Sequence, residues 1–171
     1  MSLHSPQSRG FWTRSVVFAF ALASVAGTSL EAAAESGPFS GMSGHWSGGG
    51  TLRLESGSTE RIHCRATYSV GAGGNQLTQS LRCASDSYKL DISASVTSSG
   101  GTLSGTWSES AHGEGGSISG HASGAVIRAQ VHGGAFSAGV GIHTSGGGQS
   151  VTITPTAGTD VRSVTISLHK G

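Results

Sequence analysis

The feature that most constrains this chain is an alternation of apolar and polar residues that continues through most of its length. The clearest example is the segment 60–70, ERIHCRATYSV, in which every second residue from Ile62 to Val70 is apolar or small. Successive side chains of a β-strand point to opposite faces, so this segment predicts a strand with one buried face and one face in solvent. After residue 44 no stretch shows the helical period.

Glycine-rich turns divide the alternating stretches into about ten predicted strands. The turn segments, such as 71–75 and 98–101, are too short for a helical crossover and suit antiparallel neighbours. Gly133-Gly134 is a hairpin signal that would pair Val131 with Phe136. We therefore predict an all-β domain built as an antiparallel up-and-down meander.

A meander with one apolar face must close or stack on itself to bury that face and to remove its edges. We expect a closed barrel, and the alternative is a two-sheet sandwich. A third arrangement is an outer-membrane barrel whose apolar face points to lipid. An aromatic content of 6% is low for the two aromatic girdles of such a barrel.

The only two cysteines, Cys64 and Cys83, lie on the apolar faces of neighbouring predicted strands. If Val70 pairs with Leu77 across the intervening turn, Cys64 falls opposite Cys83. Opposed residues at non-hydrogen-bonded positions lie within bridging distance. We predict a disulfide between them, which suits an exported chain.

The amino terminus has the three-part pattern of a secretory signal peptide. Arg9 and Arg14 supply a basic start, residues 15–27 form an apolar run, and small residues precede a cut expected after Ala34. The apolar run is short for a bilayer span. A retained membrane anchor is the alternative; otherwise the mature chain has no transmembrane segment and is exported to the periplasm or the medium. The predicted division is a signal peptide over 1–34, a flexible lead-in over 35–43 and one β-barrel domain over 44–171.

Charge gives no indication of a nucleic-acid or anionic-membrane partner. Ten Lys and Arg face nine Asp and Glu, and charged residues make up only 11% of the chain. A nearly neutral chain lacks the basic excess typical of nucleic-acid binding. We expect no nucleic-acid partner.

Histidines supply the candidate metal ligands. The segment 112–114, His-Gly-Glu, has ligand types at close spacing, and His121, His132 and His143 recur every eleven residues. The alternation places these three on the outer, polar face, and His132 and His143 fall at opposite ends of paired strands. We therefore expect no metal site and no cofactor.

The chain also lacks a recognisable catalytic set. A Gly-x-Ser-x-Gly nucleophile turn is absent. Glu109 shares its face with Leu103 and Trp107, and an inward carboxylate could bind a ligand or act as a base. The interpretation we favour is that Glu109 ends its strand in water. We expect no catalytic residues and no enzyme activity.

Many inner positions carry alanine or glycine, and the large inner residues are aromatic. Small inner residues could leave room for a ligand, or they could fit a flattened and fully packed interior. Glycines within strands predict bends or bulges, at Gly105, Gly120, Gly139 and Gly141.

Gly44-His45-Trp46 opens the first predicted strand and leads into an antiparallel meander. This Gly-x-Trp start resembles the calycin group, which comprises lipocalins, avidins and fatty-acid-binding proteins. The stretch from Trp46 to Gly50 is also similar to the opening strand of nitrobindin-type haem barrels, and 103–108, LSGTWS, is similar to avidin. The resemblance implies a barrel with Trp46 packed across one end, and Arg162 as a stand-in for the arginine of the last lipocalin strand. The lipocalin Thr-Asp-Tyr element, a biotin-site set and a haem-ligand histidine motif are not found. The chain as a whole resembles small exported bacterial proteins.

These features predict a periplasmic or secreted module that binds a small apolar ligand within or at the mouth of a calycin-like barrel. The candidate ligand-cavity or core aromatics are Trp46, Tyr68, Trp107 and Phe136. The alternative is an interaction or structural protein of the envelope, including a protease-inhibitor-like barrel that acts through its loops. A hollow interior would favour the first, and a packed core with an exposed patch the second.

Overall fold

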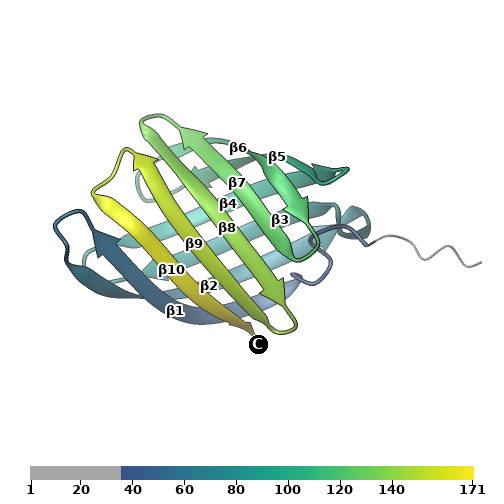
Figure 1. The fold of residues 1–171 in the computed structure, drawn as a ribbon, viewed down its shortest axis with the longest axis horizontal. Coiled ribbons are helices and arrows are strands. Elements are labelled where there is room, and N and C mark those ends of the chain that lie inside the picture. The colour runs from purple at the N-terminus through teal and green to yellow at the C-terminus, as the bar shows by residue number, and fades with distance from the viewer. Residues whose placement is uncertain (1–35) are drawn as a thin grey trace, which may run out of the picture. The chain divides into compact units, whose positions relative to one another are not determined.

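A computed structural model of the protein describes residues 36–171, which form ten antiparallel strands in a closed barrel (Figure 1). The strands follow one another around the barrel in chain order, and β1 closes it by pairing with β10. The predicted all-β closed meander is therefore confirmed. The strands are β1 Gly44–Leu54, β2 Thr59–Gly71, β3 Gln76–Ala84, β4 Lys89–Ser99, β5 Thr102–Glu109, β6 Glu114–Ser123, β7 Val126–Gly133, β8 Phe136–Ser145, β9 Gly148–Ala157 and β10 Val161–Lys170. A short 3-10 turn, η1 (Ala72–Gly74), lies between β2 and β3.

The predicted signal peptide and the cut after Ala34 lie outside the described residues. Within residues 36–171, no helix is long and apolar enough to cross a membrane.

The apolar positions of the alternation point into the barrel, and the polar positions point out. In β2, for example, the alternate residues Ile62, Cys64, Ala66 and Tyr68 are buried, while the residues between them are exposed. The predicted pairing of Val70 with Leu77 is present and places Cys64 opposite Cys83.

The predicted pairing of the β7–β8 hairpin is wrong by two residues. The structure pairs Val131 with Ala138 and Gly133 with Phe136. Gly134, which has a φ of 53°, lies in the turn, whereas Gly133 continues the strand. Because the shift is even, every side chain keeps its predicted face.

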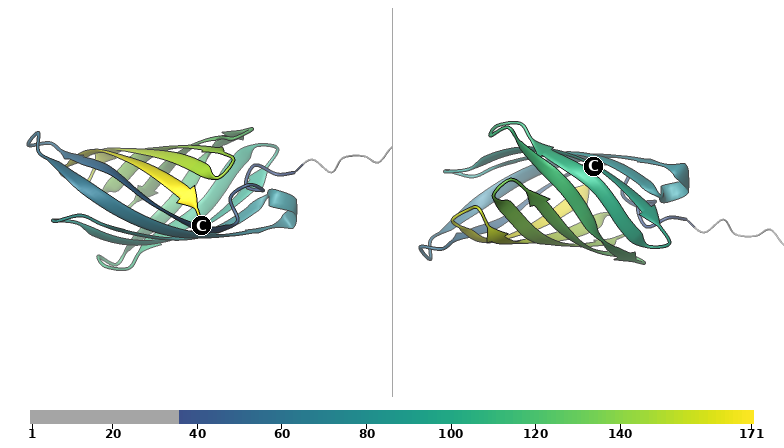
Figure 2. Two further views of the ribbon diagram at one scale, coloured as in Figure 1. Left: turned by 90° about the horizontal axis from the view of Figure 1, so that it is seen from below. Right: turned by 90° about the horizontal axis from the view of Figure 1, so that it is seen from above.

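Glycines let the barrel wall turn sharply at two places. A Cβ atom at Gly50 in β1 would collide with the carbonyl oxygen of Thr165 in β10, and one at Gly116 in β6 would collide with that of His132 in β7. Only glycine allows this close approach of two strands. Two further views show the flattened result, with β1–β4 forming one wall and β7–β10 the other (Figure 2).

Of the four strand glycines predicted to mark bends, two approach a neighbouring strand closely and two do not. Added Cβ atoms at Gly105 and Gly120 would also meet the neighbouring backbone. Gly139 and Gly141 instead lie at outer positions, where the adjacent backbone leaves room for a side chain.

The predicted flexible lead-in over 35–43 is corrected by the structure, because its described part closes one end of the barrel. Phe39 and Met42 are each only 1% exposed. The Phe39 amide donates to the carbonyl oxygen of Gly74 at 3.0 Å, and the Trp46 indole donates to the carbonyl oxygen of Met42 at 2.7 Å. Burying the apolar surface of these two large side chains is favourable, so the segment packs against the barrel and does not extend into solvent. We call this the closed end; the other end is the mouth.

Cys64 and Cys83 form the predicted disulfide, with a Cα–Cα distance of 4.2 Å, on the inner face. Replacing both with serine should lower the free energy of unfolding by about 3 kcal/mol, because the bridge restricts the unfolded chain. Urea unfolding followed by circular dichroism measures this loss. Reduced wild-type protein is the control and should unfold at a similarly low midpoint. An intact bridge whose removal leaves the midpoint unchanged would contradict this account.

Candidate functional site

The barrel interior contains a cavity of about 160 Å³. Its lining is almost entirely aliphatic and aromatic, and every strand except β1 contributes to it. The inner glycines of β1, Gly48 and Gly50, explain the exception, because that strand has no side chain to offer there. An apolar cavity of about 150 Å³ is large enough for benzene. The interior is therefore hollow on the scale of a small molecule.

Three of the four aromatics singled out from the sequence line this cavity: Tyr68, Trp107 and Phe136. The fourth, Trp46, belongs to the core beside the cavity. It is 1% exposed and packs edge-on to Tyr68, with 6.3 Å between ring centroids. It lies at the closed end, as the calycin resemblance implied. Lys170 covers its outer side, with Nζ 5.8 Å from the ring.

Trp107 and Phe136 lie toward the mouth and are only partly buried. Their rings meet edge-to-face at 5.7 Å, and the Trp107 indole donates to the carbonyl oxygen of His132 at 3.3 Å. Edge-to-face packing holds such rings more firmly than area burial alone. The pair forms the apolar border between the cavity and the mouth.

Gln79 is the polar exception in the cavity lining. Its inner position in β3 follows from its register opposite Tyr68 and Ala94. Its side-chain amide makes no hydrogen bond with any other residue of 36–171, and apolar side chains surround it in the lining. Gln79 is only partly buried, so its amide keeps some contact with solvent and is free to bond a ligand. The sequence reading missed Gln79, although it stands in the inner phase between Leu77 and Leu81.

The other polar groups near the cavity already have partners. The Tyr68 hydroxyl donates to Oε1 of Gln149 at 2.8 Å, and Nε2 of Gln149 donates to Thr144 at 3.1 Å. Burial raises the pKa of Tyr68 to about 12. Tyr68 therefore stays protonated near neutral pH, and its hydrogen-bonding capacity is used within the wall.

Contacts between turns fix one side of the mouth. The Tyr88 hydroxyl donates to Oδ1 of Asp160 at 2.6 Å, which joins the β3–β4 turn to the β9–β10 turn. Glu60 accepts hydrogen bonds from the Ser85 hydroxyl at 2.7 Å and from the Ser87 amide at 3.1 Å. The hydrogen bond to Asp160 raises the pKa of Tyr88 to about 12, so the link persists through the physiological range.

Glu109 points inward as its parity predicts, but the expectation that it ends its strand in water is wrong. It is 5% exposed and accepts hydrogen bonds from the amides of Asp91, Ala111 and His112. The His112 ring lies 2.8 Å from the same carboxylate. Burial alone would raise the pKa of Glu109, but these hydrogen bonds lower it to about 2. A carboxylate held this way fastens the β5–β6 turn and makes a poor base.

The histidines lie where the alternation placed them. His121, His132 and His143 are exposed on the outer face. In the part of the chain that the structure describes, no group of three His, Cys, Asp or Glu could hold a metal ion. Arg162 is exposed at the start of β10 and does not reach the interior.

Comparison with known proteins gives a likeness of fold alone. No protein-family model and no curated protein matches the chain. Among solved structures, Rv2717c from M. tuberculosis has a TM-score of 0.60 at 13% identity, with 77% of this chain and 94% of that chain covered. The S-type phycobiliprotein lyase CPES from Guillardia theta has a TM-score of 0.52 at 10% identity, with 77% and 89% covered. Both fit the ten-stranded antiparallel barrel.

Ionised Glu109 should make stability depend on pH in acid. Because its folded-state pKa of about 2 lies below the ordinary 4.5, its contribution is present above pH 4.5 and is lost as the pH falls towards 2. Glu109→Gln should lower the free energy of unfolding at neutral pH by about 2 kcal/mol, the scale of a charge-assisted hydrogen bond. It should also flatten the acid slope. Urea midpoints between these pH values measure both effects. Glu114→Gln, at an exposed site in the same hairpin, is the control, and equal slopes in all three proteins would refute this role.

Proposed function

We propose that the protein binds a small, mainly apolar ligand inside the barrel, and that Gln79 forms the hydrogen bond that orients it. The observation that carries this proposal is one unpartnered amide in an otherwise apolar cavity of about 160 Å³. Ligand sites in proteins commonly combine an apolar lining with a few convergent polar groups. The ligand expected here has one hydrogen-bonding group on an apolar body.

Cavity volume sets the size of that body at about six to eight heavy atoms, on the scale of a substituted benzene. A longer molecule could place only its end in the cavity, with the remainder passing Trp107 and Phe136 to the mouth. Phe39 and Met42 seal the closed end, so we place the route for the ligand at the mouth.

Binding without catalysis fits the lining. Tyr68 is its only titratable side chain among the described residues, and burial keeps that hydroxyl protonated. An acid–base reaction needs a group whose pKa lies near the working pH. The hollow interior also favours a binding module over an interaction protein with a packed core.

The Cys64–Cys83 disulfide supports a site of action in an oxidising compartment, since such bridges persist mainly outside the cytosol. We propose the periplasm or the extracellular medium, in agreement with the amino-terminal pattern. The fold likeness to a phycobiliprotein lyase is too distant to carry a substrate across to this chain.

Phenol and toluene provide a matched pair of probes, because they have nearly the same size and differ by one hydroxyl. Both should shift NMR signals of cavity residues, and phenol should bind about five- to tenfold more tightly through its hydrogen bond to Gln79. Gln79→Leu should remove the preference for phenol while toluene still binds. Gln130→Leu, on the outer face of β7, should leave both affinities unchanged.

Filling the cavity gives an independent test of the same site. Ala129→Leu adds bulk to a lining position and should weaken both probes by about tenfold or more. Its thermal midpoint and circular dichroism establish that the barrel remains folded. Failure of either probe to bind wild-type protein, or unchanged binding in Ala129→Leu, would overturn the proposal.

A further inference from the structure

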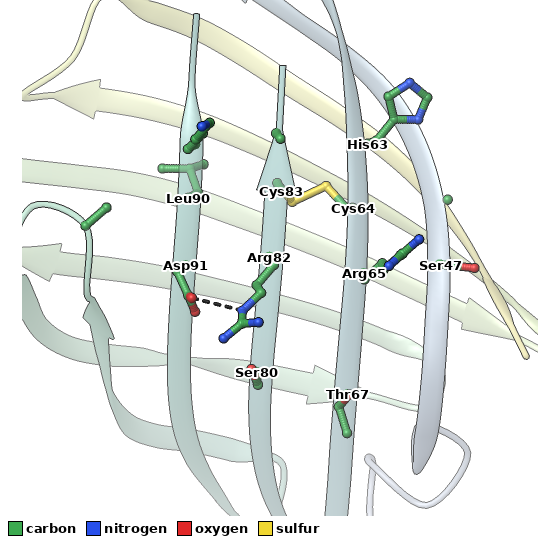
Figure 3. A pocket seen from close by; sticks show the side chains of 14 residues that line it. Ser47, His63, Cys64, Arg65, Thr67, Ser80, Arg82, Cys83, Leu90 and Asp91 are labelled. Atoms are coloured by element: carbon green, nitrogen blue, oxygen red, sulfur yellow. Dashed lines mark hydrogen bonds and ion pairs between the residues drawn. A yellow bond between two sulfur atoms is a disulfide. The ribbon is translucent and has the colours of Figure 1, made fainter. Parts of the chain in front are cut away.

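Fixed positive charge gathers on the outer face of the wall formed by β1–β4. A broad hollow lies there, and Figure 3 shows its side chains. Three fixed cations line it, Arg65 from β2, Arg82 from β3 and Lys89 from β4, together with His63. Arg61 continues the outward row of β2 just beyond the hollow. This charge lies on the opposite side of the wall from the cavity.

A single acidic residue lines this hollow. Asp91 pairs with Arg82, whose Nε lies 2.9 Å from Oδ2. Within the described chain, Arg65 and Lys89 form no ion pair. The hollow therefore keeps positive charge that the protein itself does not neutralise.

The charge of Arg65 does not stabilise the pairing of β2 with β3. Arg65 lies directly opposite Arg82 on the neighbouring strand, and like charges in this position destabilise a strand pair. Figure 3 shows the two side chains turned apart, with Arg82 toward Asp91 and Arg65 toward Ser47. The side chain of Arg82 is 76% exposed even within its ion pair. Both guanidinium groups can therefore reach a ligand in solvent.

The cations stand among small hydroxyl-bearing side chains. Ser47, Thr67 and Ser80 point outward around the arginines. Large outward apolar side chains are missing from this part of the described wall, since Leu90 and the two cysteines belong to the inner phase. The surface can bind anionic groups with its cations and alcohols with its hydroxyls.

We propose that this hollow binds an acidic polysaccharide. Arginine forms paired hydrogen bonds with carboxylate and sulfate groups, and Lys89 adds a point charge. Alternate residues along β2 are about 6.8 Å apart, so Arg61, His63 and Arg65 present a row suited to a chain of repeated anionic units. An anionic membrane is disfavoured, because no apolar side chain is available to enter the lipid interface. A single-stranded nucleic acid is disfavoured, because the lining of the hollow holds no tryptophan, tyrosine or phenylalanine on which successive bases could stack.

The net charge of +1 conceals this site, because several acidic residues of the described chain lie at the mouth and outside the lining of the hollow. Glu55, Asp86 and Asp160 lie in turns at the mouth, and Glu109 and Glu114 flank the β5–β6 turn there. The hollow and the internal cavity are separate sites, so a negative binding result at one leaves the proposal for the other unaffected.

Dextran sulfate at low salt is the probe, and neutral dextran of the same length is the control ligand. Calorimetry should show salt-sensitive binding of dextran sulfate and none of neutral dextran. The double variant Arg65→Gln, Lys89→Gln should bind about tenfold more weakly. Arg128→Gln, which removes an exposed strand arginine from β7, is the matched control and should bind like wild type. Unchanged thermal midpoints show that the variants remain folded, and NMR shifts of Ser47, Thr67 and Ser80 locate the ligand without any substitution.

An equal loss in Arg128→Gln, or shifts spread over the whole barrel, would show diffuse charge attraction and overturn the site. Absence of binding by wild type would also overturn it. Tighter binding of phosphatidylglycerol vesicles or of a single-stranded oligonucleotide than of dextran sulfate and polygalacturonate would overturn the choice of a polysaccharide.

Discussion

The pairing of β1 with β10 is the interaction on which the remaining structure depends. It removes the two edges that a ten-stranded meander would otherwise expose and turns every inner side chain into core. The pairing requires the wall to turn at β1, where the backbone of β10 approaches Gly48 and Gly50 too closely for any side chain. The same glycines leave β1 without a share in the cavity lining. Closure and the position of the cavity thus have a common cause.

A closed barrel still has two ends, and in this protein the two ends differ in structure. At one end Phe39, Met42 and Trp46 cover the interior and are each 1% exposed. At the other end Trp107 and Phe136 stay partly exposed, while hydrogen bonds between turns hold the far side of the mouth. A barrel sealed at one end and bordered by aromatic rings at the other has a single direction of access. This asymmetry is the reason for placing the route of the proposed ligand at the mouth.

The sequence correctly predicted the features that depend only on which residues of a strand share a face. Period-two alternation assigned the inner face, and the pairing of Val70 with Leu77 brought Cys64 opposite Cys83 without further assumption. Even the wrong β7–β8 register kept each face, because it was shifted by two residues. The same alternation places Gln79 on the inner face. We overlooked it because a polar residue at an inner position breaks the apolar pattern used to find strands.

Features that depend on contacts far apart in sequence were beyond the same reasoning. Phe39 and Met42 stand in a short segment without periodicity, so their burial depends on where η1 and β1 place the end of the barrel. Glu109 is inward by parity, but its environment comes from the amides of its own turn and of Asp91 in β4. The cationic hollow needs three strands in register before Arg65, Arg82 and Lys89 become neighbours. Composition averages over the whole surface and cannot show such a separation of charge.

The alternation also gives one wall an apolar inner face and a cationic outer face. Along β2 and β3, inward Tyr68 and Gln79 face the cavity, while outward Arg65 and Arg82 face the hollow. Side chains on opposite faces of one strand do not touch, so each set can change without altering the contacts of the other. The Cys64–Cys83 bridge fixes the two strands to each other beside both sites, which keeps the register that each site requires. A register slip by one residue would exchange the two faces, placing arginines in the apolar interior and apolar residues in solvent. The cost of that exchange is the physical reason that one strand pairing can define both surfaces.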